Sequence, residues 1–171
     1  INPAFIFSKI GDIFCSQCLG ILSIAACIRA RGHHVEVVDA LFRGNSIATP
    51  LNGGGYRVGL ADNDIIRLIP DDVELIGLSV PFSHLAGVAH KLVANIKAKY
   101  ADIPVVMGGV YPSTQPMLAL ESGADYIAMG EGEESLTKLI DHISDKSRVP
   151  LPVGIIPRQH PEYIGIDLSL I

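Results

Sequence analysis

Residues 104–134 contain two short apolar runs, each followed at once by a glycine turn and a helix start. Residues 105–107 lead into a Gly-Gly pair, and residues 126–129 lead into a Gly-Glu-Gly-Glu run. Continuous apolar runs of this length are typical of strands that are buried on both faces of a parallel sheet. A sheet built from such units binds ligands at the turns that follow its strands. The pattern therefore predicts an α/β fold with a ligand site at these turns.

Strand and helix signals alternate about five times along the chain, which favours parallel strands with helices on both faces. We predict a flavodoxin-like (Rossmann-like) open sheet of five strands in the order 2-1-3-4-5. The expected strands are residues 1–7, 35–39, 73–79, 104–107 and 126–129. The ligand edge would then hold the turns at residues 2–3, 79–82, 108–114 and 130–133.

Helical periodicity is clearest over residues 83–100, where apolar residues recur at positions i, i+3, i+4, i+7, i+8 and i+11 from Leu85. Further helices are expected over residues 19–31, 62–69, 116–120 and 133–144. For the helix over 19–31, the predicted inward stripe is Leu19, Leu22, Ala26 and Ile28. Residues 40–61, with Pro50 and the run Gly53–Gly55, predict an extended, mobile excursion.

Composition excludes several classes of function. A chain of 171 residues with 49% hydrophobic and 18% charged residues is long enough to bury its own core. No apolar run approaches the 18 residues of a membrane span, and no signal peptide is visible. The net charge of −5, without clustered Lys or Arg, argues against nucleic-acid binding. Three cysteines leave one unpaired in any disulfide scheme, which favours a reducing cytoplasm.

The two ends suggest a piece of a longer protein. Ile1-Asn2-Pro3 resembles the end of a buried strand, so we expect the beginning of that strand to be missing. After Lys146, four prolines and two glycines predict a linker. We therefore expect a domain over residues 1–146 and a linker over residues 147–171 that leads to an absent domain.

The turn residues support binding better than catalysis. Gly108-Gly109 is consistent either with close approach of a bulky ligand or with a tight strand-to-loop turn. In the run 130–133, Glu131 and Glu133 favour a helix cap and would repel phosphate. The chain contains no Gly-x-Gly-x-x-Gly or Walker-type sequence.

The remaining candidates for chemistry are cysteines and histidines. Cys15 and Cys18 are spaced as a redox or metal pair, but with Cys27 they supply only three thiols, whereas a zinc site needs four ligands. His33-His34 is expected in a turn, and His84 lies near the ligand edge, where it is either a base or a solvated first-turn residue. No complete catalytic apparatus is visible, so we expect this segment itself to be non-catalytic.

Together, these motifs resemble the cobalamin-binding domain that precedes the catalytic barrel in many radical S-adenosylmethionine enzymes. The Gly-Gly-x-x-Pro and Gly-Glu-Gly-Glu elements are the most specific part of the resemblance. Residues 167–170 also resemble the connector that enters the barrel. The matching segments are residues 19–26, 31–39, 76–79, 105–114 and 125–133.

The resemblance implies that cobalamin lies along the carboxyl edge, with its nucleotide tail entering near Ser79 and crossing Gly108-Gly109. The wider fold has Ser-x-Leu at the third-strand turn, whereas this chain has Ser79-Val80-Pro81. The Asp-x-His-x-x-Gly run is absent, which is usual for the radical S-adenosylmethionine members. The implied cofactor-binding residues are Leu19, Gly20, Ser79, Val80, Pro81, Gly108, Gly109, Val110, Tyr111, Pro112, Ser113, Thr114, Gly130, Glu131, Gly132 and Glu133.

No Cys-x-x-x-Cys-x-x-Cys motif occurs, so a [4Fe-4S] cluster and S-adenosylmethionine would belong to the full-length protein only. The full-length protein would then be a methyltransferase or a cyclase, and this segment would present the corrin to a downstream barrel. Two alternatives remain open: a structural or interaction domain of the same fold without cofactor, and a flavin- or nucleotide-binding flavodoxin-like domain.

Overall fold

The computed structural model describes residues 1–9, 11, 18–145 and 148–161. Its main sheet contains β4 (Ile76–Ser79), β5 (Val105–Gly108), β6 (Tyr126–Ala128) and β7 (Ile155–Pro157), in that order. β4, β5 and β6 are parallel, and β7 is antiparallel to β6. The α/β class with a parallel sheet is confirmed, but the number and order of the strands differ from the expected 2-1-3-4-5. Within the described residues, no helix is long and apolar enough to span a membrane.

The first two expected strands, over residues 1–7 and 35–39, do not form in the main sheet. Residues 35–39 form no strand, and only an isolated parallel bridge joins Asn2 to Asp39. On the other side, the backbone N–H of Ser79 donates to the carbonyl of Ile1 at 2.9 Å. Ile1 and Asn2 therefore lie between residues 38–40 and β4, in the position of a central strand, but they pair over two residues only.

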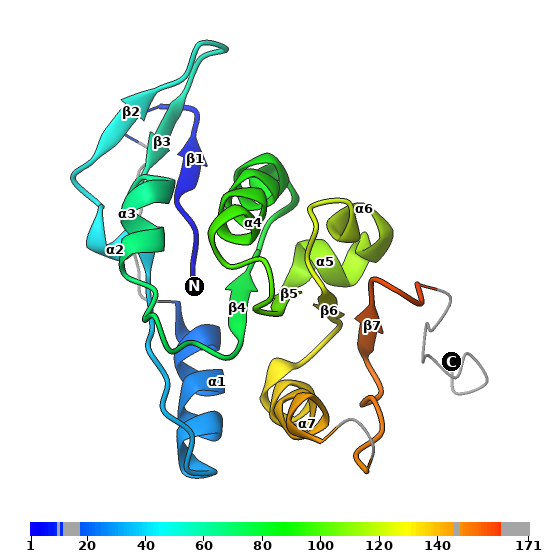
Figure 1. Ribbon diagram of the computed structural model, residues 1–171. Helices are drawn as coiled ribbons and strands as arrows, with labels where there is room; N and C mark the ends of the chain where they lie inside the picture. Colours follow the sequence, from blue (N-terminus) through cyan, green and yellow to red (C-terminus); the bar gives the residue numbers. More distant parts are fainter. Residues whose placement is uncertain (10, 12–17, 146–147, 162–171) are drawn as a thin grey trace.

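Helices cover both faces of the main sheet (Figure 1). α1 (Leu19–Ala30) and α7 (Gly132–Ser144) lie on one side. α4 (Ala86–Lys99), α5 (Val110–Thr114) and α6 (Pro116–Leu120) lie on the other, with a short 3-10 turn, η2 (Ser83–Leu85), before α4. The expected helices over 83–100, 116–120 and 133–144 are confirmed to within three residues at each end.

The main core lies between β4–β6 and α4. Leu85, Ala89, Leu92, Val93 and Ile96 are buried, so the predicted stripe of this helix does face the sheet. Met107 and Ile127 meet it from β5 and β6 as members of the same apolar cluster. Burial of one such side chain contributes about 1.5–3 kcal/mol.

Of the predicted inward stripe of α1, only Ile28 is buried. Leu19 and Leu22 are exposed, whereas Ala25 and Ile28 are buried. The helix is apolar on more than one face, so its periodicity does not decide which face packs. Contact with α7 decides it instead, because Gly132 lies against the side chain of Ile24.

Residues 40–61 form ordered structure where a mobile excursion was expected. They contain α2 (Ala40–Arg43), β2 (Ala48–Pro50) and β3 (Tyr56–Val58), and β1 (Phe5–Phe7) pairs antiparallel with β3. The resulting sheet has the order β1-β3-β2. A 2.6 Å ion pair from Arg57 to Asp62 joins it to α3 (Asp62–Arg67), and both side chains are mostly buried.

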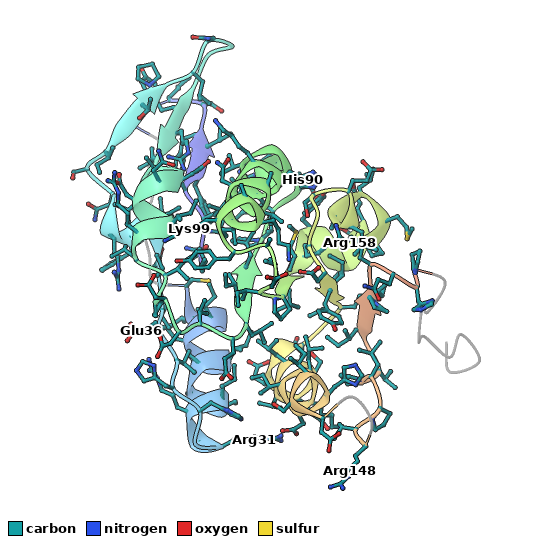
Figure 2. All side chains as sticks on the ribbon, in the orientation of Figure 1. Arg31, Glu36, His90, Lys99, Arg148 and Arg158 are labelled. Carbon is teal, nitrogen blue, oxygen red and sulfur yellow. The ribbon has the colours of Figure 1, made fainter. Side chains whose placement is uncertain are left out.

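Within the segment over which a linker was expected, residues 155–157 join the main sheet as β7. Asp125 connects this part to α4 and β5: its Oδ2 accepts from Lys97 Nζ and from the Val105 N–H, both at 2.9 Å. Its Oδ1 lies 3.5 Å from Arg158 Nη2 (Figure 2). The carboxylate therefore holds three elements together.

Asp125→Ala is expected to lower the free energy of unfolding by about 1.5–3 kcal/mol, because the Val105 N–H loses its acceptor and the Lys97 ammonium keeps only the Ile103 carbonyl. The control is Asp141→Ala, which removes an exposed ion pair with Arg31 and should change stability by about 0.5 kcal/mol or less. Urea titration followed by circular dichroism measures both. Equal effects of the two changes would contradict the role given to Asp125.

Candidate cofactor site at the carboxyl edge of the sheet

The turns after β4, β5 and β6 are hydrogen-bonded to one another. The Val80 N–H donates to the Gly108 carbonyl at 2.7 Å, and the Tyr111 N–H donates to the Val80 carbonyl at 3.2 Å. On the other side, the Gly130 N–H donates to Ser113 Oγ at 3.0 Å. The three turns that were predicted from separate parts of the sequence thus form one continuous edge.

Gly109 serves the turn itself. Its φ is +109°, and a Cβ at this position would lie 2.7 Å from the Val80 carbonyl oxygen. Of the two interpretations of the Gly-Gly pair, this geometry favours the tight turn for Gly109. Gly108 differs, because a Cβ there would make ordinary contacts of 3.6 Å with the Ala128 side chain.

A cavity of about 520 Å³ opens between α1, α7 and the face of the sheet. Apolar side chains of both helices form its outer wall. At the carboxyl edge, eight of the sixteen predicted site residues line it. These are Gly20, Ser79, Gly108, Gly109, Gly130, Glu131, Gly132 and Glu133.

The other eight predicted residues lie outside the cavity lining. Val80, Tyr111 and Pro112 are buried, and they hold the turn after β5 in place. Tyr111 also bonds to α4, since its hydroxyl lies 2.8 Å from His90 Nε2 (Figure 2). Burial is the main cause that raises the pKa of the Tyr111 hydroxyl, so this group stays protonated at neutral pH. The other five predicted residues outside the cavity lining are Leu19, Pro81, Val110, Ser113 and Thr114.

Three large apolar side chains are exposed beside these turns. Leu19 is 76% exposed at the start of α1, Phe82 is 51% exposed after β4, and Val110 is 61% exposed after β5. Phe82 packs edge-on against Phe5 at 6.1 Å and stacks on His84 at 5.5 Å. The edge therefore combines an apolar rim with an opening into the cavity.

The start of α7 adds negative charge to this opening. Glu131 and Glu133 line it, and no ion pair is recorded for either carboxylate within the described chain. Glu134 instead pairs with Lys138 at 2.6 Å, and a hydrogen bond from that lysine is the main cause that lowers the pKa of Glu134. Carboxylates beside the first N–H groups of a helix are stabilised by its dipole.

The outer wall of the cavity was not predicted from the sequence. Residues of α1 and α7 form this wall. Both helices were predicted, but nothing in their sequences indicated that they would cover a ligand cavity. The available signal was the second apolar face of α1. A helix that packs against a single surface needs only one apolar face, so a second one indicates another contact. The missed residues are Ile21, Ile24, Ala25, Ile28, Leu136 and Ile140.

The candidate metal and redox residues are not brought together. Cys15 lies outside the described residues, and Cys18 and Cys27 are free thiols. His33 and His34 line the opposite end of the cavity, away from the carboxyl edge, and His34 lies 3.6 Å from Glu36. Among the described residues, no group of three or more His, Cys, Asp or Glu is placed to hold a metal ion.

Known proteins match this chain in sequence and in structure. The cobalamin-binding family described as "B12 binding domain" matches residues 14–140. The anaerobic magnesium-protoporphyrin IX monomethyl ester cyclase of Synechocystis sp. is 27% identical over 155 residues, which cover 85% of this chain and 27% of the cyclase.

Two structures of the radical S-adenosylmethionine methyltransferase TsrM from Kitasatospora setae share the fold at 22% identity. The one with tryptophan and a S-adenosylmethionine analogue bound has a TM-score of 0.62 and matches 91% of this chain and 27% of TsrM. The one with cobalamin and a [4Fe-4S] cluster has a TM-score of 0.61, with 91% and 26% coverage. The chain spans about a quarter of the length of these relatives. The resemblance drawn from the sequence is confirmed: this chain belongs to the B12-binding domain family.

Proposed function

We propose that this chain binds cobalamin along the carboxyl edge of its sheet and presents the corrin to the catalytic domain of a radical S-adenosylmethionine enzyme. The observation that carries the proposal is the cavity that opens at this edge, lined by glycines and Ser79, in a member of the B12-binding domain family. The similarity to TsrM, whose structure holds cobalamin and a [4Fe-4S] cluster, supports the assignment.

The residues at the opening fit the nucleotide tail of cobalamin. Gly20 and Gly130 have open space where a Cβ would stand, so a ligand can approach their backbone. Ser79 Oγ has no recorded hydrogen bond within the described residues, and it lines the cavity. The Ser79 hydroxyl therefore offers a donor and an acceptor to a polar ligand.

The apolar rim fits the corrin itself. Leu19, Phe82 and Val110 would bury their exposed surface against the ring, at about 25 cal/mol for each Å² removed from water. Cobalamin, when bound, supplies a cobalt atom that carries a methyl group or exchanges electrons. This chain contains no Cys-x-x-x-Cys-x-x-Cys motif. The [4Fe-4S] cluster and S-adenosylmethionine would therefore be bound by the part of the enzyme outside this chain.

The direct test is retention of the cofactor. The purified chain is mixed with hydroxocobalamin, desalted and examined by visible absorption, with bovine serum albumin as a control for nonspecific carry-over. We expect about one corrin for each chain. A colourless protein, from a preparation that circular dichroism shows to be folded, would contradict cobalamin binding and favour the structural or interaction domain.

Ser79→Ala is expected to weaken hydroxocobalamin binding about 5- to 10-fold, because one hydrogen bond to the ligand is lost. The matched control is Ser144→Ala, whose hydroxyl bonds to the Ile140 carbonyl at the far end of α7. Absorbance titration gives the dissociation constant of each variant. An unchanged value for Ser79→Ala would show that the tail does not pass this residue.

A further inference from the structure

The turn after β5 is anchored to α4 by one pair of side chains. His90 lies on the side of α4 that faces α5 and α6 (Figure 2), and its Nε2 is 2.8 Å from the hydroxyl oxygen of Tyr111 in α5. The centroids of the two rings are 5.9 Å apart, and the ring planes are tilted by 47°. Tyr111 is buried, whereas His90 is half-buried. The hydrogen bond therefore ties a buried ring of the turn to a side chain of the helix.

α4 is a firm support for this contact, and α5 is not. α4 has 14 residues, and Ala89, Leu92 and Val93 are fully buried in it. α5 has only five residues, and one of them is Pro112, which has no N–H to donate. A helix this short is not stable by itself in water. The turn after β5 therefore takes its position from contacts with its neighbours.

Tyr111 transmits this position to the opening of the cavity. Its N–H donates to the Val80 carbonyl at 3.2 Å, which joins it to the turn after β4. Two residues further along α5, the Ser113 N–H donates to the Gly109 carbonyl at 3.1 Å, and Ser113 Oγ accepts from the Gly130 N–H at 3.0 Å. Gly109 and Gly130 both line the cavity. A displacement of Tyr111 would therefore move the turns after β5 and β6 together.

The contact between His90 and Tyr111 is available in either charge state of the imidazole. A neutral ring with its proton on Nδ1 accepts at Nε2 from the tyrosine hydroxyl, and an imidazolium donates to the hydroxyl oxygen instead. A glutamine side chain offers both a donor and an acceptor in the same way, whereas a phenylalanine ring offers neither. These two replacements therefore separate the hydrogen bond from the shape of the ring.

We propose that His90 is a positioning residue: through Tyr111 it fixes the turns after β5 and β6 in the arrangement that admits the nucleotide tail of cobalamin. Neither His90 nor Tyr111 lines the cavity, so the proposal includes no contact between either side chain and the ligand. The effect of His90 on affinity rests on the proposed function, whereas its effect on the turns does not.

Amide hydrogen exchange of the unliganded chain tests the effect on the turns. We expect His90→Phe to speed exchange at the N–H groups of Tyr111 and Gly130 about 10-fold relative to Val93, a buried residue of α4. His90→Gln should restore slow exchange at both groups. The matched control is Tyr100→Phe, which removes the hydroxyl that bonds to the Ile69 carbonyl at the other end of α4 and should leave both groups unchanged.

Titration with hydroxocobalamin tests the effect on affinity, at a temperature at which circular dichroism shows every variant to be folded. His90→Phe is expected to weaken binding about 5-fold, and His90→Gln should stay within about 2-fold of the native chain. In a Tyr111→Phe background, His90→Phe should cause no further loss, because the hydroxyl through which His90 acts is already absent.

Three results would overturn the proposal. The first is that exchange at Tyr111 and Gly130 rises no more than at Val93 in His90→Phe, which would make His90 a packing residue only. The second is that His90→Gln behaves like His90→Phe, and the third is that His90→Phe binds hydroxocobalamin as tightly as a native chain that retains it. Failure of the native chain to retain hydroxocobalamin would contradict only the proposed function, because the exchange experiment is carried out without the cofactor.

Discussion

Gly109→Val is expected to prevent folding or to lower the free energy of unfolding by about 4 kcal/mol or more. The new Cβ would lie 2.7 Å from the Val80 carbonyl oxygen and 2.9 Å from its carbon, both rigid backbone atoms. The φ of +109° adds strain of about 1–3 kcal/mol for a β-branched residue. Two hydrogen bonds between the β4 and β5 turns lie beside this contact, so the damage would spread to the whole ligand edge.

Thermal and urea unfolding of Gly109→Val, Gly108→Ala and the native chain measure this effect. Gly108→Ala is the neighbouring control, because its Cβ meets the Ala128 side chain at an ordinary 3.6 Å and its φ is not positive. Stability changes of similar size at the two positions would contradict the packing role of Gly109. This result also bears on the choice of variants, since loss of binding in Gly109→Val would report misfolding and not a missing ligand contact.

Gly108→Leu is expected to weaken hydroxocobalamin binding about 100-fold while leaving the chain folded. Gly108 lines the cavity beside Ala128, so a leucine side chain there would fill the space assigned to the nucleotide tail. Exclusion of the tail would cost most of the contacts made by that part of the ligand, and 100-fold corresponds to about 2.7 kcal/mol. This expectation depends on the proposed cobalamin site.

The matched control is Gly87→Leu on α4, an exposed glycine with nothing within 4 Å of its Cβ position. Both variants are titrated with hydroxocobalamin, and their melting temperatures are compared. Equal affinities for Gly108→Leu and the native chain would place the tail elsewhere. A large loss of melting temperature in Gly108→Leu would instead show that the side chain cannot enter the cavity without disturbing the sheet.

The local sequence was enough to predict helices with a single apolar face and strands that are short apolar runs ending at a turn. The stripe of α4 was predicted correctly because one face is apolar and the other carries Lys91, Asn95 and Lys99. The strands β4, β5 and β6 were found because each is a short apolar run that ends at Ser79 or at a glycine turn. The family was recognised from the same turns, since their spacing depends on the chain alone.

Tertiary contacts decided what the local pattern left ambiguous. α1 is apolar on more than one face, and its packing against α7, where Ile24 lies against Gly132, selects the side that faces inward. Residues 40–61 contain many turn formers, yet pairing with β1 turns them into a hairpin within a second sheet. Such pairings join residues far apart in sequence, so no local pattern reports them.

For the candidate site, the sequence by itself determined the turns, and the structure decided what each turn residue does. Both glycines of the Gly-Gly pair look alike in sequence and both line the cavity, but a Cβ at Gly109 would clash with the Val80 backbone, whereas one at Gly108 would make only ordinary contacts with Ala128. The outer wall formed by Ile24 and Leu136 also depends on how two helices pack across the sheet. A cavity is a property of packed surfaces, whereas turn chemistry is a property of neighbouring residues, and this difference separates what could be predicted from what could not.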